Sequence, residues 1–168
     1  KWLDEATRLM QYTFDNFFDN NTSMFFFTSK KDNPLIARKF EIQDNVIPAS
    51  NSTIAKCLFR LGHILSNNYY LDTSSQMASN IKKDIINYGS GYSNWARLIT
   101  YHTYPFYEIG IVGKDYKQKT NVLQKKYLPN TIFIGTEKNS TLDILKHKFT
   151  QGMTYIYVCE NGACQQPT

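Results

Sequence analysis

The chain has 168 residues, of which 42% are hydrophobic, 15% aromatic and 20% charged. This composition excludes a disordered chain, and a net charge of +5 is too small for a strongly cationic polymer. No stretch reaches the roughly 18 consecutive apolar residues of a membrane-spanning helix. We therefore expect a folded, cytoplasmic protein without a membrane partner. Composition alone does not indicate its chemistry.

The first half of the chain has the periodicity of α-helices. Apolar residues recur every three or four positions in four ranges, 2–17, 54–65, 71–85 and 92–99. The second of these helices is expected to begin at Asn51 or Ser52. Short polar connectors between the last three helices predict antiparallel helical hairpins. The segment 29–50 is an irregular loop, longer than an ordinary connection, and loops of this length often carry function.

The periodicity changes after residue 105. Strands are predicted at 106–112, 131–134 and 153–158, and helices at 116–127 and 140–149. This β-α-β-α-β order predicts a small, mostly parallel sheet, because parallel strands need crossover connections. The predicted fold is therefore mixed α and β. Residues 1–105 form helical hairpins with the long loop, and residues 106–168 form a small α/β unit that ends in a cysteine-containing hairpin.

The cysteines differ in what they indicate. Cys57 lies within a predicted helix and is expected to be buried. Cys159 and Cys164 flank Asn161-Gly162, the strongest short signal for a type I′ hairpin, which would bring their Cα atoms to about 4.5 Å. A disulfide, packed thiols and a redox pair all fit this geometry. Two cysteines do not make a zinc site, so we expect no metal. We also expect no cofactor.

Five polar residues are candidates for a binding or catalytic site. Glu41 and Asp44 lie in the long loop, where paired carboxylates do acid–base chemistry if they project into a cleft and otherwise only solvate the loop. Asn51 and Ser52 are either ligand-binding or helix-capping residues. His102 lies between tyrosines, and aromatic neighbours are common in sugar-binding clefts. The lysine cluster over 114–126 more often forms a solvated helix face, so no nucleic-acid partner is expected.

Several segments together resemble a known family. They are FFFTS at 25–29, the stretch 41–52 with the helix that ends in Arg60-Leu61-Gly62, the strand 108–113, the turn 127–130 and the terminal YVCxxxxCxxP at 157–167. In order and spacing they are similar to the C-terminal part of the YyaL-type proteins, whose animal relatives are called spermatogenesis-associated protein 20. Ala49 departs from the pattern, because family members often have Ser or Gly at that position.

The resemblance implies a longer parent protein. Family members carry an N-terminal thioredoxin-like domain followed by an (α/α) toroid of the six-hairpin glycosidase type. This chain would then hold the last hairpins of an incomplete toroid, and its partners would include the rest of the parent chain. An isolated piece would expose the apolar helix face of Trp2, Leu9 and Phe17, which a homodimer would cover. The family has no firmly established activity, so it assigns no catalytic residue.

The first functional hypothesis is a carbohydrate-active or carbohydrate-binding toroid with a glycosidase- or epimerase-like parent. Glu41 or Asp44 would act as acid or base, and Asn51, Ser52 and His102 would contact a sugar ligand. This hypothesis rests on an analogy between folds, and the fragment is not expected to be active alone.

The second hypothesis is a non-catalytic accessory region of a thioredoxin-like redox protein. In this case Cys159 and Cys164 would act as a thiol pair toward a partner. The two hypotheses place the site at opposite ends of the chain, and they differ in which side chains must be accessible.

Overall fold

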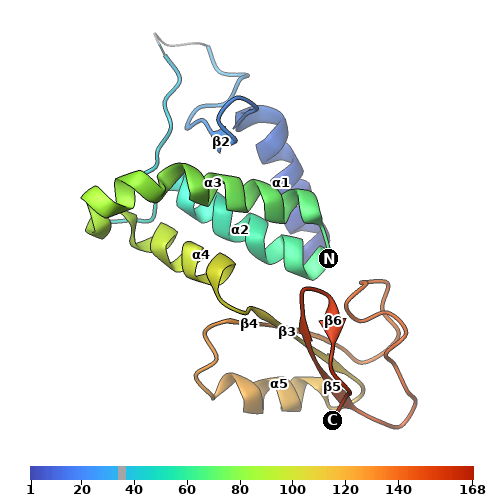
Figure 1. Cartoon of the computed structure of the whole chain (residues 1–168). Coiled ribbons are helices and arrows are strands. Elements are labelled where there is room, and N and C mark those ends of the chain that lie inside the picture. Colours follow the sequence, from blue (N-terminus) through green and yellow to red (C-terminus); the bar gives the residue numbers. More distant parts are fainter. Residues whose placement is uncertain (34–36) are drawn as a thin grey trace. The chain divides into compact units, whose positions relative to one another are not determined.

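The structure is a computed structural model that describes residues 1–33 and 37–168. The chain divides into two compact units (Figure 1). The helical unit comprises Lys1–Leu61 and Tyr69–Thr100, and the sheet unit comprises Gly62–Asn68 and Tyr101–Thr168. The predicted mixture of α and β structure is confirmed. No helix among the described residues is both long enough and apolar enough to cross a membrane.

The four helices predicted in the first half of the chain are confirmed. They are α1 (Trp2–Phe17), α2 (Ser50–Leu65), α3 (Asn68–Asn87) and α4 (Ser93–Thr103), with a 3₁₀ turn η1 (Gly89–Tyr92) before α4. A two-stranded hairpin of β1 (Phe18–Asp19) and β2 (Met24–Phe25) follows α1. In this unit the fully buried side chains include Phe25, Leu58, Met77, Trp95 and Leu98. They come from different elements, so the core is the place where β2 and the helices meet.

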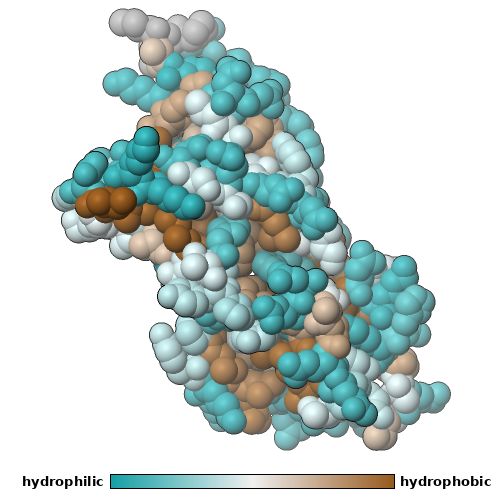
Figure 2. Space-filling model, in the orientation of Figure 1, coloured by the Kyte–Doolittle hydropathy of each residue, from teal (hydrophilic) through white to brown (hydrophobic). Residues whose placement is uncertain are grey.

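Part of the apolar surface of the helical unit is exposed. Trp2 is 81% exposed and Leu9 is 50% exposed, as expected, whereas Phe17 is half-buried. Figure 2 shows a second hydrophobic area at the C-terminal end of α3, where Ile86 is 84% exposed. Isolated apolar residues on a surface are normal, so their exposure alone identifies no partner.

The main sheet has four strands in the order β4-β3-β5-β6. These are β3 (Tyr107–Val112), β4 (Thr131–Thr136), β5 (Tyr155–Glu160) and β6 (Ala163–Cys164). β3 pairs with β4 in parallel, across a connection that contains α5 (Tyr116–Gln124), but it pairs with β5 in antiparallel. The predicted mostly parallel sheet is therefore wrong, because only one of its three pairings is parallel.

The reason lies in the segment between β4 and β5. The segment 140–149 contains a run of turns instead of the predicted helix, and His147 has a positive φ of 60° that an α-helix does not admit. The apolar residues of this turn segment still face the core, since Ile144 and Leu145 are buried. Without a crossover helix, the chain returns directly and enters β5 antiparallel to β3.

Two different layers cover the faces of this sheet. On one face Ile109 and Ile111 of β3 are buried, and α5 packs nearby with the ring of Tyr116 over Gly135 of β4. The opposite face carries an apolar cluster with the turn segment, whose buried members are Val112, Ile134, Ile144, Leu145 and Cys159. Because side chains alternate along a strand, Glu108 of β3 lies on this second face with Val112.

The cysteine-containing hairpin is confirmed. Cys159 pairs with Cys164 and Glu160 with Ala163, around a turn at Asn161 and Gly162. Both turn residues have positive φ, 51° and 80°, as a type I′ turn requires. Asn and Gly are the residues that adopt this conformation at the lowest cost.

Candidate functional site

The carboxylate of Asp44 caps two helices. Its Oδ1 accepts hydrogen bonds from the Ala49 N–H (3.0 Å) and the Ser52 hydroxyl (2.9 Å), at the start of α2. Its Oδ2 accepts the N–H of Asn94 (2.9 Å) in the first turn of α4. A negative charge at a helix N-terminus is stabilised by unpaired N–H groups and by the helix dipole. Asp44 is therefore engaged at both oxygens.

Glu41 and Asn51 complete this network. Glu41 Oε2 accepts the Ser50 N–H at 2.9 Å. The fully buried Asn51 amide accepts the N–H of Phe25 and donates to its carbonyl, both at 2.8 Å, and donates also to the Glu41 carbonyl at 2.9 Å. The side chain of Asn51 thus satisfies the backbone of β2 as a neighbouring strand would.

The structure brings Glu41, Asp44, Asn51 and Ser52 together, as the carbohydrate hypothesis requires. The two carboxylates bind N–H groups at helix starts, and Asn51 binds the backbone of β2. A nearby open groove of about 540 Å³ lies between the β1–β2 turn, the loop and α3. It is lined by other residues, namely Asn21, Thr22, Ser23, Met24, Phe40, Ile42, Gln76, Asn80, Ile81 and Asp84.

His102 lies in the last turn of α4 and is counted with the sheet unit. Burial, and then the charge of His63, lowers the pKa of His102 to about 4. The imidazole of His102 is therefore neutral near pH 7. Glu41 and Asp44 belong to the other unit, the helical one.

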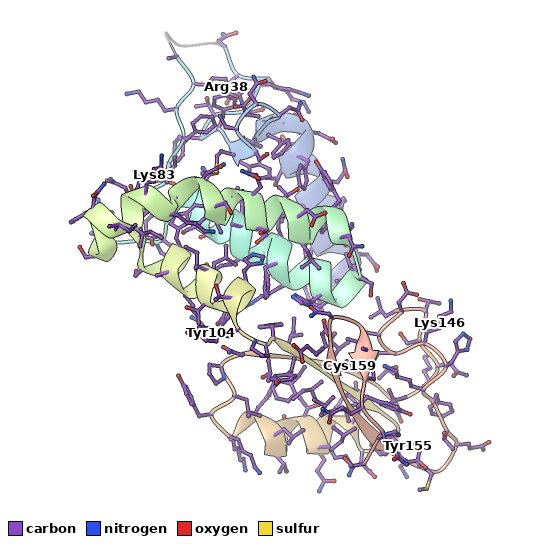
Figure 3. The ribbon with its side chains drawn as sticks, in the orientation of Figure 1. Arg38, Lys83, Tyr104, Lys146, Tyr155 and Cys159 are labelled. Carbon is purple, nitrogen blue, oxygen red and sulfur yellow. A yellow bond between two sulfur atoms is a disulfide. The ribbon has the colours of Figure 1, made fainter. Side chains whose placement is uncertain are left out.

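The terminal cysteines form a disulfide between Cys159 and Cys164 (Figure 3). Its two ends differ in accessibility, because Cys159 is 1% exposed whereas Cys164 lies on the surface. The expectation for Cys57 is wrong, since this free cysteine is exposed on α2. The apolar stripe of α2 is formed by Ala55, Leu58 and Phe59, which leaves Cys57 on the outer side.

An ammonium group lies directly against the disulfide. Lys148 Nζ, from the turn segment, is 2.8 Å from Sγ of Cys164 and 3.7 Å from Sγ of Cys159. The ammonium also donates to the Ile144 carbonyl at 2.6 Å and lies 4.9 Å from the centre of the Tyr157 ring. Burial lowers the pKa of Lys148, and the negative charge of Glu108 opposes this shift.

A buried acid and a buried imidazole lie under the same sheet face. Glu108 Oε1 is 2.6 Å from Nδ1 of His63, which comes from the last turn of α2. Glu108 is 2% and His63 is 8% exposed, and the imidazole packs against the ring of Phe106. Among the described residues, the second oxygen of Glu108 is buried without a hydrogen-bond partner.

Sequence reasoning identified Cys159 and Cys164 as candidates but missed Lys148, Glu108 and His63. One signal was present, because Glu108 is an acid within an otherwise apolar strand, FYEIGIV, and a buried acid needs a partner. Which residue would be that partner could not be read from the chain, since His63 precedes it by 45 positions.

The comparisons with known proteins do not assign this chain to a family. A scan against protein-family models found no match, and no curated protein matched the chain.

Among the described residues, no three His, Cys, Asp or Glu side chains are grouped to hold a metal ion. The sheet unit thus combines a half-exposed disulfide, a contacting ammonium and a buried acid–imidazole pair. The helical unit combines an open groove with carboxylates that bind helix starts.

Proposed function

We propose that Cys159 and Cys164 are a redox pair that exchanges its disulfide with a dithiol of a partner protein. In this proposal the chain is the accessory region of a larger redox protein. The observation that carries it is the contact of Lys148 with the sulfur of the exposed Cys164. A cation beside a cysteine favours the thiolate, which is the reactive form in exchange reactions.

The exchange balances with a dithiol as reductant. A partner thiolate attacks Sγ of Cys164, the S–S bond breaks, and its electron pair goes to Sγ of Cys159. The second partner thiol then attacks the mixed disulfide and releases Cys164. The partner ends as a disulfide, and the two cysteines end as thiols with the two electrons and two protons that the partner lost.

The unequal burial of the two sulfurs supports this order of events. Attack requires access to the sulfur along the S–S axis, and Cys164 is the exposed member of the pair. In the reverse direction, the Cys164 thiolate beside Lys148 would be the first nucleophile. Cys159 would then be the resolving thiol, because it is buried and adjacent.

The resemblance described above supplies a candidate for the partner. If the parent protein carries a thioredoxin-like domain, that domain would present the dithiol to this hairpin. A structural disulfide persists in oxidising compartments, whereas one in the cytoplasm is usually transient and catalytic. The cytoplasmic location, which stays a prediction, therefore agrees with a redox-active pair.

The test uses the full chain with Cys57→Ser, so that only the pair is labelled by a maleimide reagent. We expect dithiothreitol to reduce the folded protein and to release two thiols. Lys148→Met should slow the reaction of the reduced protein with oxidised glutathione about tenfold near pH 7. The matched control, Lys146→Met, removes an exposed lysine from the same segment and should leave the rate within twofold. A disulfide that is reduced only after unfolding would overturn the proposal.

We also propose a carbohydrate ligand for the groove of the helical unit, as a second function. Carboxamide side chains such as Gln76 and Asn80 and the carboxylate of Asp84 can hydrogen-bond sugar hydroxyls, and Phe40 lines the same groove. A sugar screen on the parent protein, with Asp84→Asn for the groove and Glu41→Gln and Asp44→Asn for the capped carboxylates, tests this. Binding that is lost only in Asp84→Asn would favour the groove, and no binding by any sugar would reject the second function.

A further inference from the structure

We propose that the buried Glu108–His63 pair is the proton acceptor and donor of the Cys159 thiol. This inference rests on the redox function proposed above and deepens it, because it assigns the step in which the buried sulfur gains or loses its proton. It concerns residues to which neither functional hypothesis gave a role.

The register of the sheet places the acid beside the sulfur. Glu108 of β3 is the cross-strand partner of Cys159 of β5. Partners in an antiparallel pair point to the same face, with Cβ atoms about 4.5–5.5 Å apart. The neighbour of Cys159 along the chain, Glu160, lies on the opposite face and is exposed.

Burial makes a local proton carrier necessary. When the disulfide is reduced, the electron pair of the S–S bond stays on Cys159, which is only 1% exposed. A buried thiolate is costly unless it is protonated or paired. On reoxidation the Cys159 thiol must lose that proton before it attacks the mixed disulfide, and bulk water does not reach it.

The hydrogen bonds of Glu108 leave one of its carboxylate oxygens able to accept a proton. One carboxylate oxygen is bound by His63, which holds the side chain in place. The other oxygen is buried and has no hydrogen-bond partner among the described residues. Buried carboxylate oxygens are normally satisfied, so an orphaned one points to a catalytic role. The Cys159 thiol is a donor on the same face.

Two other titratable groups act on the pair. Lys148 faces the disulfide from the turn segment, but an ammonium has no acceptor and so stabilises a thiolate without taking its proton. His102 of α4 acts electrostatically on His63, and its low pKa leaves it uncharged near neutral pH. Glu108 and His63 are therefore the groups that can accept the proton of Cys159.

The proton balance is simple. On reduction the pair gives one proton to the Cys159 thiolate as the S–S bond breaks, and it regains a proton from solvent afterwards. On reoxidation the pair removes the proton as Cys159 attacks Sγ of Cys164 and displaces the partner thiolate. The partner dithiol remains the source of electrons in the first direction, and a partner disulfide is the oxidant in the second.

The decisive experiment follows the resolving step. In the Cys57→Ser background, the reduced protein is converted to the mixed disulfide of Cys164 with glutathione, and the release of glutathione by Cys159 is timed. Glu108→Gln keeps the size of the side chain and its bond to His63, but it cannot take a proton. We expect release to slow by about 10- to 100-fold and to lose its pH inflection. The first step, at Cys164, should change by less than twofold.

Glu160→Gln is the matched control. It removes a carboxylate from the residue that follows Cys159, on the exposed face of the sheet, and this variant should release glutathione at the wild-type rate. Equal rates for Glu108→Gln and wild type would overturn this inference alone. A wild-type disulfide that dithiothreitol does not reduce in the folded state would instead overturn the redox function, and the inference with it.

A measurement on the wild-type sequence covers the case in which Glu108→Gln does not fold. Carbon-13 labelling of glutamate allows the Glu108 carboxyl signal to be followed against pH in the disulfide and the dithiol forms. If the pair exchanges a proton with Cys159, the signal must titrate at different pH in the two forms, because linkage is reciprocal. Identical curves in both forms would overturn the inference.

Discussion

Asp44 in the helical unit and Glu108 in the sheet unit are both partly or fully buried acids, but their surroundings differ. Asp44 accepts three hydrogen bonds, two of them from backbone N–H groups at helix starts. Glu108 accepts at one oxygen only and leaves the other without a partner among the described residues. A fully bonded acid stabilises a fold and has little capacity for chemistry, whereas an under-bonded one costs stability and keeps that capacity.

If the hydrogen-bond network around Asp44 stabilises the fold, the largest loss of stability is expected when its buried amide, Asn51, is removed. Asn51→Ala removes three hydrogen bonds and leaves the N–H and the carbonyl of Phe25 without the amide that binds them, so we expect a loss of about 3 kcal/mol in the free energy of unfolding. Urea unfolding followed by the fluorescence of the buried Trp95 measures it. The exposed Asn45→Ala, in the same loop, should change stability by less than about 0.5 kcal/mol. Equal stabilities of the two variants would contradict the role of the amide.

Asp44→Ala is expected to have the next largest effect. It removes a cap from α2 and from α4 at once, and single caps contribute about 1 kcal/mol each, so a loss of about 2 kcal/mol is expected. The same fluorescence measurement applies, with the exposed Asp72→Ala of α3 as control. If Asp44→Ala were as stable as wild type, the contrast between a structural and a functional acid would fail.

His102 makes the sheet unit sensitive to acid. Its pKa falls from 6.5 to about 4 on folding, so between these values the unfolded state binds more protons and stability decreases as pH is lowered. After allowance for partial solvent screening, we expect roughly 1.5 kcal/mol to be lost over this window. Urea unfolding followed by far-ultraviolet circular dichroism at several pH values tests this. His102→Gln should lose less stability than wild type over the same window, and parallel curves would refute the prediction.

The smallest effect is expected at the hairpin turn. Gly162 has a φ of 80°, which L-residues rarely adopt, so Gly162→Ala should cost about 1 kcal/mol although no atom lies within 4 Å of the added Cβ. Gly89→Ala is the control, since Gly89 has equal space and no such φ. Thermal unfolding of both variants measures the difference. A cost that is equal at both positions would show that backbone conformation does not hold the turn.

Local sequence patterns were sufficient to predict much of the fold. The spacing of apolar residues identified the helices, and Asn161-Gly162 identified the hairpin, because both depend on neighbours along the chain. The turn segment shows the limit, since Leu142 and Leu145 have helical spacing and face the core, yet His147 takes a conformation that ends any helix. The direction of β5 followed from that difference.

The sites depend on contacts between distant residues, which no local pattern contains. Asp44 was a candidate acid from its position in a long loop, but its capping of Asn94 joins residues 50 positions apart. The disulfide pair was found because its two members are close in sequence. Lys148 approaches it from 16 positions away, and only the fold reveals that contact.

The double cap of Asp44 also bears on the order of folding. The N–H of Asn94 and the loop that carries Asp44 meet only after the intervening helices have formed, so the loop acquires its final anchor late. During synthesis α4 follows this loop, so the bond between Asp44 and Asn94 would form after the loop has met α2. Until then the loop would be held at Glu41, through its hydrogen bonds with Ser50 and Asn51.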